Sequence, residues 1–314
     1  MSDCCKCGGC PDVFSPEYLN ARCGREGEVE FYRREGSGLP TVRIRNPFGV
    51  AEITLYGAHV LNWTPTGQAK PVIWLSDKAV FAPGKPIRGG IPVCWPWFGA
   101  CSFNPKNPAH GFARISFWNV HSVSYLADGR TAIEFVLRDS DKTREWWPNA
   151  FQAALTVVVG WSLEVSLKVT NTGDAPWTYT GALHTYFGTG DITRTTLYGL
   201  EGTDYLDTVG GSHRKMVQDG PVTFTSETDR IYRNTAAMVT ADDRELDRQI
   251  TIVKDGSIST VVWNPWIDKS IKMADFGDDE YKTMFCVEAV NTLDDEITLD
   301  PGASHTLSQT ICVE

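Results

Sequence analysis

A histidine and a glutamate lie in two separate stretches that are otherwise typical of β-strands. His184 lies within GALHTYFGTGDI at 181–192, and Glu288 lies within MFCVEAVN at 284–291. Side chains alternate between the two faces of a strand, so His184 shares one face with Tyr186. A histidine and a carboxylic acid of different pKa can give one proton to a substrate and take another from it. Sandwich folds also bury such residues for structure alone, so the two residue types leave both interpretations open.

The second group of polar residues lies in an irregular tract at 81–114, FAPGKPIRGGIPVCWPWFGACSFNPKNPAHGFAR. Its apolar content predicts an ordered loop that is folded against the domain and carries a site. Among the polar side chains of the tract are Lys85, Arg88, His110 and Arg114. Guanidinium groups suit carboxylate or phosphate ligands, but these arginines could equally pair with acidic residues of neighbouring strands. Gly89 and Gly90 would let the backbone pass close to a ligand.

The elements that position these residues are predicted to be short antiparallel strands. Runs rich in Val, Ile, Thr and aromatic residues recur along the chain, and many end at turn sequences such as ADGR, NTGD and KDGS. Helical periodicity is nearly absent, apart from short stretches near FSPEYLNAR and KSIKMADFG. The sequence therefore predicts an all-β protein, a large antiparallel β-sandwich with more strands than an immunoglobulin domain. We expect one domain at 30–314, preceded by a flexible Cys-rich extension at 1–29.

Charge and composition exclude several classes of partner. The 314 residues carry a formal net charge of -10, and 42% of them are hydrophobic. Nucleic acids and anionic membranes require a basic surface, so neither is predicted as a partner. No run approaches the roughly 18 apolar residues of a membrane span, and the N-terminus lacks the apolar core of a signal peptide. We predict a cytoplasmic monomer whose partner is a small molecule.

The cysteines fall into two groups. The first ten residues contain four of them: Cys4, Cys5, Cys7 and Cys10. One CxxC pair is present, but no second pair follows at zinc-site spacing, so the sequence predicts a flexible tail and no metal site. The remaining cysteines are predicted to be reduced and mostly buried thiols: Cys23, Cys94, Cys101, Cys286 and Cys312.

Six motifs, in order along the chain, carry a resemblance to a known family. They are GKPIRGGIPVCWPWFG, HGFAR, ALHTYF, TDRIY, VVWNPW and FCVEAVN. In these motifs the chain resembles the D-hexose-6-phosphate mutarotases, also called glucose-6-phosphate 1-epimerases, a branch of the aldose 1-epimerase superfamily. The resemblance covers roughly 30–312. It implies a galactose-mutarotase-like β-sandwich that interconverts the α and β anomers of hexose 6-phosphates, first of all glucose 6-phosphate, without a metal or an organic cofactor.

The resemblance also implies a role for each catalytic residue. By similarity, His184 is the general acid that protonates the ring oxygen of the sugar. Glu288 is the general base that takes the proton from the anomeric hydroxyl. The ring opens to the aldehyde, the C1 end rotates, and the same two groups close the ring on the other face. Such proton transfers need no strong nucleophile, and each typically contributes about 10²- to 10⁴-fold.

The binding residues follow from the same motifs. Arg88 and Arg114 match the positions that hold the 6-phosphate, which explains how an acidic protein could bind an anion. Asp229 matches a position that hydrogen-bonds sugar hydroxyls. His110 is expected either to contact the sugar or to support the residues that do. Where family members often show PLVFPQFG, this chain has PVCWPWFG, and Trp97 could replace a hydrogen bond to the sugar by ring stacking.

Two questions stay open at the level of the sequence. Trp146 and Trp147 of DKTREWWPNAF could either close the core or line the cleft. The fold could also serve a non-catalytic sugar-phosphate sensor or carbohydrate-binding protein, or a mutarotase of unphosphorylated aldoses. A glycosidase is disfavoured, because it would need paired carboxylates and here one of the pair is a histidine.

Overall fold

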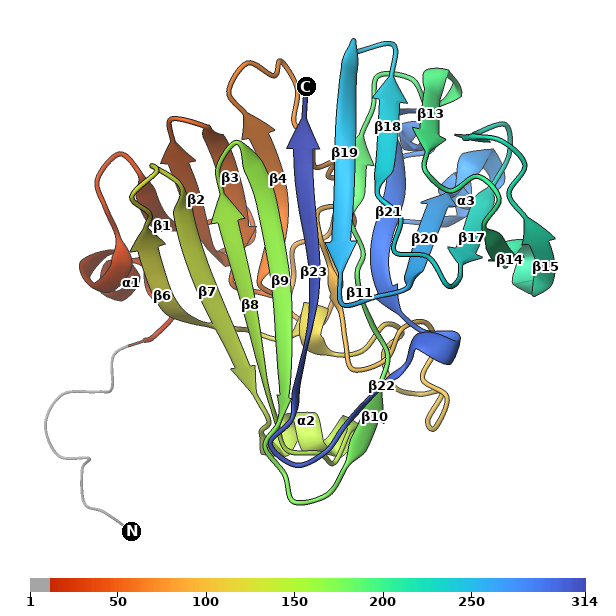
Figure 1. Ribbon diagram of the computed structural model, residues 1–314. Helices are drawn as coiled ribbons and strands as arrows, with labels where there is room; N and C mark the ends of the chain where they lie inside the picture. The colour runs from red at the N-terminus through yellow and green to blue at the C-terminus, as the bar shows by residue number, and fades with distance from the viewer. Residues whose placement is uncertain (1–11) are drawn as a thin grey trace, which may run out of the picture.

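The computed structural model describes residues 12–314, and within this range the protein is built almost entirely from antiparallel strands (Figure 1). The prediction of an all-β sandwich is confirmed. A nine-stranded sheet and an eight-stranded sheet pack against each other, with a four-stranded sheet at one side. The four cysteines predicted to lie in a flexible tail fall outside the described residues.

The nine-stranded sheet forms one layer of the sandwich (Figure 1). In β8 (Phe151–Val159), buried and half-buried residues alternate along the whole strand, because alternate side chains point to opposite faces. The other strands, in sheet order, are β16 (Val222–Thr223), β13 (Thr195–Tyr198), β18 (Val239–Asp243), β19 (Arg248–Asp255), β23 (Ser304–Val313), β9 (Ser162–Asn171) before β8, and β7 (Thr131–Arg138) and β6 (Asn119–Tyr125) after it.

The eight-stranded sheet forms the other layer. It contains Glu288, and two of its strands flank His184. Its central strand, β21 (Met284–Asn291), is buried at every position, as expected for a strand covered on both faces. The other strands are β15 (Arg214–Val217), β14 (Asp204–Asp207), β17 (Thr228–Tyr232), β20 (Ser259–Asn264), β11 (Gly181–Leu183), β5 (Val93–Cys94) and β12 (Tyr186–Gly188).

Two smaller sheets complete the fold. The four-stranded sheet contains β1 (Val29–Arg33), β2 (Pro40–Asn46), β3 (Gly49–Thr54) and β4 (His59–Pro65), and a two-stranded sheet pairs β10 (Trp177–Tyr179) with β22 (Ile297–Leu299). Three short α-helices are present in the described range, α1 (Pro16–Cys23), α2 (Asp141–Trp146) and α3 (Trp266–Lys272). None of the helices in residues 12–314 is long and apolar enough to cross a membrane.

The main core lies between the two large sheets and extends to the four-stranded sheet. Phe187, Phe285 and Val287 of the eight-stranded sheet join it. A polar link also crosses this interface, because Gln309 of β23 donates a hydrogen bond to the backbone oxygen of Val287 (2.9 Å) and accepts one from the hydroxyl of Thr185. These residues alternate with His184, Tyr186 and Glu288, so the candidate catalytic residues face away from the main core.

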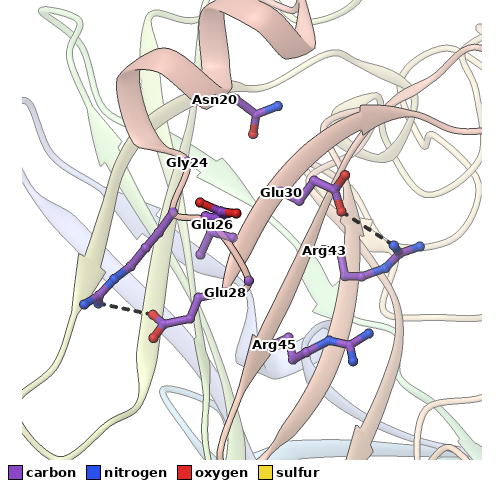
Figure 2. Close-up of a pocket in the computed structure, with 10 residues that line it drawn as sticks. Asn20, Gly24, Glu26, Glu28, Glu30, Arg43 and Arg45 are labelled. Atoms are coloured by element: carbon purple, nitrogen blue, oxygen red, sulfur yellow. Dashed lines mark ion pairs between the residues drawn. The ribbon is translucent and has the colours of Figure 1, made fainter.

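The folded domain begins before residue 30, which corrects the predicted boundary. The prediction of a short helix near FSPEYLNAR is confirmed by α1, and its Leu19 is buried in the main core. The amide of Asn20 exchanges two hydrogen bonds with the backbone of Phe31, at 2.7 and 2.8 Å. Asn20 also borders a hollow of about 590 Å³. Figure 2 shows the residues that line it, with the ion pair of Glu30 and Arg43 among them. Residues 16–29 are therefore part of the domain.

The tract at 81–114 is folded against the domain, as predicted, but its glycines have a different role from the one expected. A Cβ on Gly89 would lie 2.6 Å from the Cα of Leu75, and one on Gly90 would lie 2.4 Å from the ring of His59. Both glycines have positive φ, at 100° and 69°. The absence of side chains therefore lets the loop pass close to other protein segments, and a ligand is not needed to explain it.

The question left open for the two tryptophans of 141–151 is settled in favour of the core. Trp147 is buried and contacts the rings of Trp95 and Trp177 edge to face, at 5.2 and 4.8 Å. Trp146 is half-buried and stacks on Phe112 at 5.7 Å. Of the cysteines predicted to be buried thiols, Cys94, Cys101 and Cys286 are buried and Cys23 and Cys312 half-buried; all five are free.

Candidate active site

His184 lies at a break between two short strands, whereas the sequence predicts it within one continuous strand. β11 ends at Leu183 and β12 begins at Tyr186, and the backbone N–H of His184 donates instead to Pro92 (3.1 Å). Both short strands pair with β21 in the same register, with Leu183 opposite Ala289 and Tyr186 opposite Cys286. His184 therefore falls directly opposite Glu288 and on the same face of the sheet.

The side chains of His184 and Glu288 meet on this face. His184 Nε2 lies 3.4 Å from Glu288 Oε1, and the two side chains are only 12% and 1% exposed. Within residues 12–314, His184 Nδ1 and Glu288 Oε2 have no hydrogen-bond partner. Buried polar atoms are normally hydrogen-bonded, so these two atoms retain unused hydrogen-bonding capacity. The structure thus brings together the two residues that the sequence predicts as acid and base.

The surroundings shift the pKa of both groups. Burial raises the pKa of Glu288 well above its usual value, and the charge of Asp229 adds to the effect. Burial lowers the pKa of His184 well below its usual value, and the positive charges nearby contribute, those of Arg114 and Arg88 among them. Burial therefore favours the uncharged pair, a carboxylic acid beside a neutral imidazole.

Aromatic rings surround His184. The ring of Tyr186 is nearly parallel to the imidazole, with centroids 4.8 Å apart and an interplanar angle of 12°. Trp263 of β20 and His110 of the irregular tract approach edge to face, at 6.2 and 5.8 Å. These contacts fix the orientation of the imidazole.

His110 lies close to His184, in agreement with its predicted place near the site. Burial lowers the pKa of His110 to about 3, so the ring is neutral. Its backbone has a positive φ of 61°, and a Cβ on the next residue, Gly111, would lie 1.9 Å from the backbone oxygen of Trp95. Gly111 is therefore required for the tight turn that brings the imidazole of His110 to the site.

Arg88 reaches the same face but is not free of protein partners. Its Nη1 donates to the hydroxyl of Tyr186 at 3.1 Å, and its Nη2 lies 3.2 Å from the carboxylate of Asp275. Its buried Nε has no hydrogen-bond partner within residues 12–314. Of the two interpretations, pairing with an acidic residue is observed, and the guanidinium still retains unused N–H groups.

Arg114, unlike Arg88, has no carboxylate partner among the described residues. Its Nη2 donates to the backbone oxygen of Ala109 at 2.9 Å, and no carboxylate of the described residues forms an ion pair with it. Its positive charge opposes the rise in the pKa of Glu288 and adds to the lowering of the pKa of His184. The second arginine thus lies close enough to the acid–base pair to act on it.

Asp229 lies on the same face of the sheet, two strands away from Glu288. It is opposite Trp263 of β20, which in turn is opposite Cys286 of β21. Its carboxylate lies 3.6 Å from the ammonium group of Lys269 on α3. Burial raises the pKa of Asp229, and Lys269 acts in the opposite direction. Position and partial exposure leave this carboxylate able to accept hydrogen bonds.

Trp97 is placed differently from the prediction. Its side chain belongs to the main core, 5% of the residue is exposed, and its ring N–H already donates to Pro108 (2.9 Å). Its ring contacts Phe103 and Phe112 edge to face. Because the ring is covered by other aromatic residues, the predicted stacking on a sugar is not supported.

Three residues that border the site were not predicted as site residues from the sequence. Tyr186 has a signal, since it lies two residues after His184 on the same strand face. Asp275 and Lys269 have none, because they come from a distant segment around α3 and only the fold brings them near Arg88 and Asp229. The approach of Lys269 to Asp229 depends on the pairing of β17 with β20, and Asp275 is held near Arg88 by a contact with Ser76.

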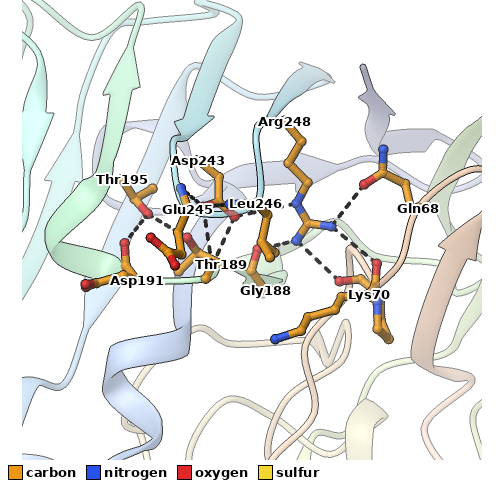
Figure 3. Close-up of polar contacts among 12 residues, drawn as sticks. Gln68, Lys70, Gly188, Thr189, Asp191, Thr195, Asp243, Glu245, Leu246 and Arg248 are labelled. Carbon is orange, nitrogen blue, oxygen red and sulfur yellow. Dashed lines mark hydrogen bonds and ion pairs between the residues drawn. The ribbon is translucent and has the colours of Figure 1, made fainter.

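The strand end next to the site is fixed by a buried ion pair (Figure 3). Arg248 of β19 donates to the backbone oxygen of Gly188, the last residue of β12, at 2.8 Å. Its Nε lies 3.6 Å from the carboxylate of Asp243, and both side chains are almost completely buried. Asp243 also accepts the backbone N–H of Gly190 at 3.1 Å. This cluster holds β12 and the turn after it.

Solved structures with this fold define the class of protein. A structure from Salmonella typhimurium, described as a "putative mutarotase", matches with a TM-score of 0.84 and 34% sequence identity, covering 91% of this chain and 93% of that one. A galactose mutarotase-like protein from Lactobacillus casei shares the fold at a TM-score of 0.70 and 17% identity, covering 87% of this chain and 100% of that one. The sandwich is therefore of the mutarotase class.

Sequence comparison gives the family. The family model described as Aldose 1-epimerase matches residues 40–312. An Escherichia coli K12 protein named "Putative glucose-6-phosphate 1-epimerase" is 37% identical over 281 residues, which cover 90% of this chain and 92% of that protein. A Cenchrus ciliaris protein of the same name is 38% identical over 275 residues, covering 85% and 82%. The chain belongs to the aldose 1-epimerase family and is an epimerase.

Proposed function

We propose that the protein interconverts the α and β anomers of hexose 6-phosphates, with glucose 6-phosphate as the preferred substrate. The observation that carries the proposal is the buried His184–Glu288 pair at 3.4 Å, with one unpartnered atom on each side chain in the described structure. The names of the relatives and the two arginines beside the pair support a phosphorylated sugar.

The pair can complete the reaction without changing its total number of protons. Ring opening starts from carboxylate and imidazolium, which arise from the uncharged pair by transfer of one proton from Glu288 to His184. Glu288 then takes the proton of the anomeric hydroxyl, His184 gives its proton to the ring oxygen, and the C1–O bond to the ring breaks. The pair is uncharged again, which is the form that burial favours. After rotation about C1–C2, the reverse transfers close the ring.

The binding residues are assigned on the same basis. Arg88 and Arg114 hold the phosphate, because guanidinium groups donate several hydrogen bonds to phosphate oxygens. Asp229 accepts hydrogen bonds from sugar hydroxyls, and His110 supports the orientation of His184. The monomeric state and the cytoplasmic location stay predictions from the sequence.

The test is the rate of anomer exchange of glucose 6-phosphate and of free glucose, measured by exchange NMR of the C1 proton. We expect the protein to accelerate exchange of the phosphorylated sugar, and His184→Ala to lower turnover by at least about 10²-fold through loss of general acid catalysis. His121→Ala is the control, because His121 is an exposed histidine on β6. A full rate in His184→Ala would remove that residue from the mechanism.

The same assay separates the alternatives. Acceleration of free glucose alone would keep the acid–base pair and exclude the sugar phosphate as substrate. Tight binding of glucose 6-phosphate without acceleration would identify a non-catalytic sensor. Either result would overturn the proposed function.

A further inference from the structure

Tyr186 is buried between the candidate acid and the candidate phosphate arm. Its residue is 2% exposed, and its ring is nearly parallel to that of His184, at 4.8 Å. Trp74 lies nearly parallel to the same ring at 5.8 Å, and Trp263 approaches it edge to face at 5.9 Å. The phenol ring is thus held by aromatic contacts and has little freedom to reorient.

The hydroxyl of Tyr186 makes a different contact from the ring. It accepts a hydrogen bond from Nη1 of Arg88 at 3.1 Å. Burial raises the pKa of Tyr186, so the phenol stays neutral in the physiological range and the oxygen remains an acceptor for the guanidinium. Hydrogen bonds to a charged group stabilise more than those between neutral groups.

Asp275 holds the opposite side of the same guanidinium, at 3.2 Å from Nη2. The backbone of Asp275 is itself fixed, since its oxygen accepts a hydrogen bond from the hydroxyl of Ser76 (3.0 Å). The next residue, Phe276, is completely buried and packs on Trp74 at 5.3 Å. Arg88 is therefore held between two fixed groups, and its remaining N–H groups have a defined direction.

We propose that Tyr186 is a positioning residue with two separable functions. Its hydroxyl orients Arg88 for the phosphate, and its ring orients His184 for proton transfer. This inference rests on the proposed function, because it assigns the specificity of that same site. A single side chain thereby links recognition of the phosphate to the placement of the acid.

Two substitutions separate the functions. Tyr186→Phe keeps the ring and removes the hydroxyl, so we expect the KM for glucose 6-phosphate to rise about tenfold while kcat stays within about twofold. Tyr186→Leu removes the ring as well, so we expect kcat to fall about tenfold in addition, because the imidazole loses its stacking partner. The expected split between KM and kcat would not arise from a general loss of packing.

Tyr232→Phe is the matched control. Tyr232 lies in the same sheet, is fully buried, and donates its hydroxyl to Gln218 at 2.6 Å, away from Arg88 and His184. We expect it to leave both KM and kcat close to those of the wild type. Circular dichroism checks the fold of every variant, and if the leucine variant does not fold, Tyr186→Phe alone decides.

The outcomes distinguish this inference from the proposed function. Wild-type protein that accelerates no anomer exchange overturns the proposed function and, with it, the inference. An active wild type together with a Tyr186→Phe variant that behaves like Tyr232→Phe overturns the inference alone. A fall in kcat without a rise in KM for Tyr186→Phe also overturns it, because the hydroxyl would then act on catalysis and not on Arg88.

Discussion

Arg114 and Arg88 differ in how much of their charge is available. Arg88 is shared between Tyr186 and Asp275, whereas Arg114 contacts only a backbone oxygen among the described polar contacts. A guanidinium already paired with a carboxylate attracts a phosphate less than an unpaired one does. At the scale of single residues, we therefore expect Arg114 to contribute strongly to phosphate binding.

Arg114→Gln tests this expectation. Loss of a charged hydrogen-bond donor to a ground-state phosphate should raise the KM for glucose 6-phosphate about tenfold or more, with a smaller change in kcat. Steady-state anomerisation kinetics measures both constants. Arg138→Gln, at an exposed arginine on β7, is the control. An unchanged KM in Arg114→Gln would assign the phosphate to Arg88 instead.

At the scale of elements, the site depends on the break between β11 and β12. The break frees two residues from the ladder while both strands keep their register on β21, so His184 and Glu288 remain opposite each other. The Arg248–Asp243 pair anchors the far end of β12. Placement of His184 therefore depends on an ion pair that lies outside the site.

Asp243→Ala tests the importance of this anchor for stability. Removing one partner leaves the buried Arg248 uncompensated, and such changes typically lower the free energy of unfolding by about 3–5 kcal/mol. Urea unfolding gives the change directly. Glu245→Ala is the control, since Glu245 pairs with Arg194 at the exposed surface and such pairs contribute about 0–1 kcal/mol. Equal effects of the two substitutions would contradict the assigned role.

At the scale of the whole molecule, the buried carboxyl group makes stability depend on pH. Burial raises the pKa of Glu288 in the folded protein, while an unfolded chain has the ordinary value of about 4.3. Between these two values the folded protein binds more protons than the unfolded chain does. The contribution of Glu288 to the free energy of unfolding therefore falls as the pH rises through this range.

Glu288→Gln removes this contribution. The variant cannot titrate at this position, so we expect its stability relative to the wild type to increase from about pH 5 to about pH 8. Groups far from Glu288 titrate alike in both proteins and cancel in the difference. Urea unfolding at several pH values measures it, and a difference that does not change with pH would contradict a raised pKa. We also expect the Glu288→Gln variant to lose catalysis, because it lacks the proposed general base.

The sequence by itself determined the fold class and the family, and it predicted His184 and Glu288 as the acid–base pair. Alternating apolar residues predict strands because a strand has two faces, and His184 and Glu288 stand out because each is polar within an apolar run. The motifs around them are local in the chain. Sequence reasoning could therefore reach these residues without knowing which strands are neighbours.

Only the tertiary structure decided how these residues are placed. The break at His184, the pairing of Arg88 with Asp275 and the burial of Trp97 depend on contacts between segments that are distant in the sequence. Local patterns carry no information about such contacts, because strand pairing and side-chain packing are fixed by the whole fold. For the same reason, the contacts of Tyr186 with both His184 and Arg88 could be found only in the folded structure.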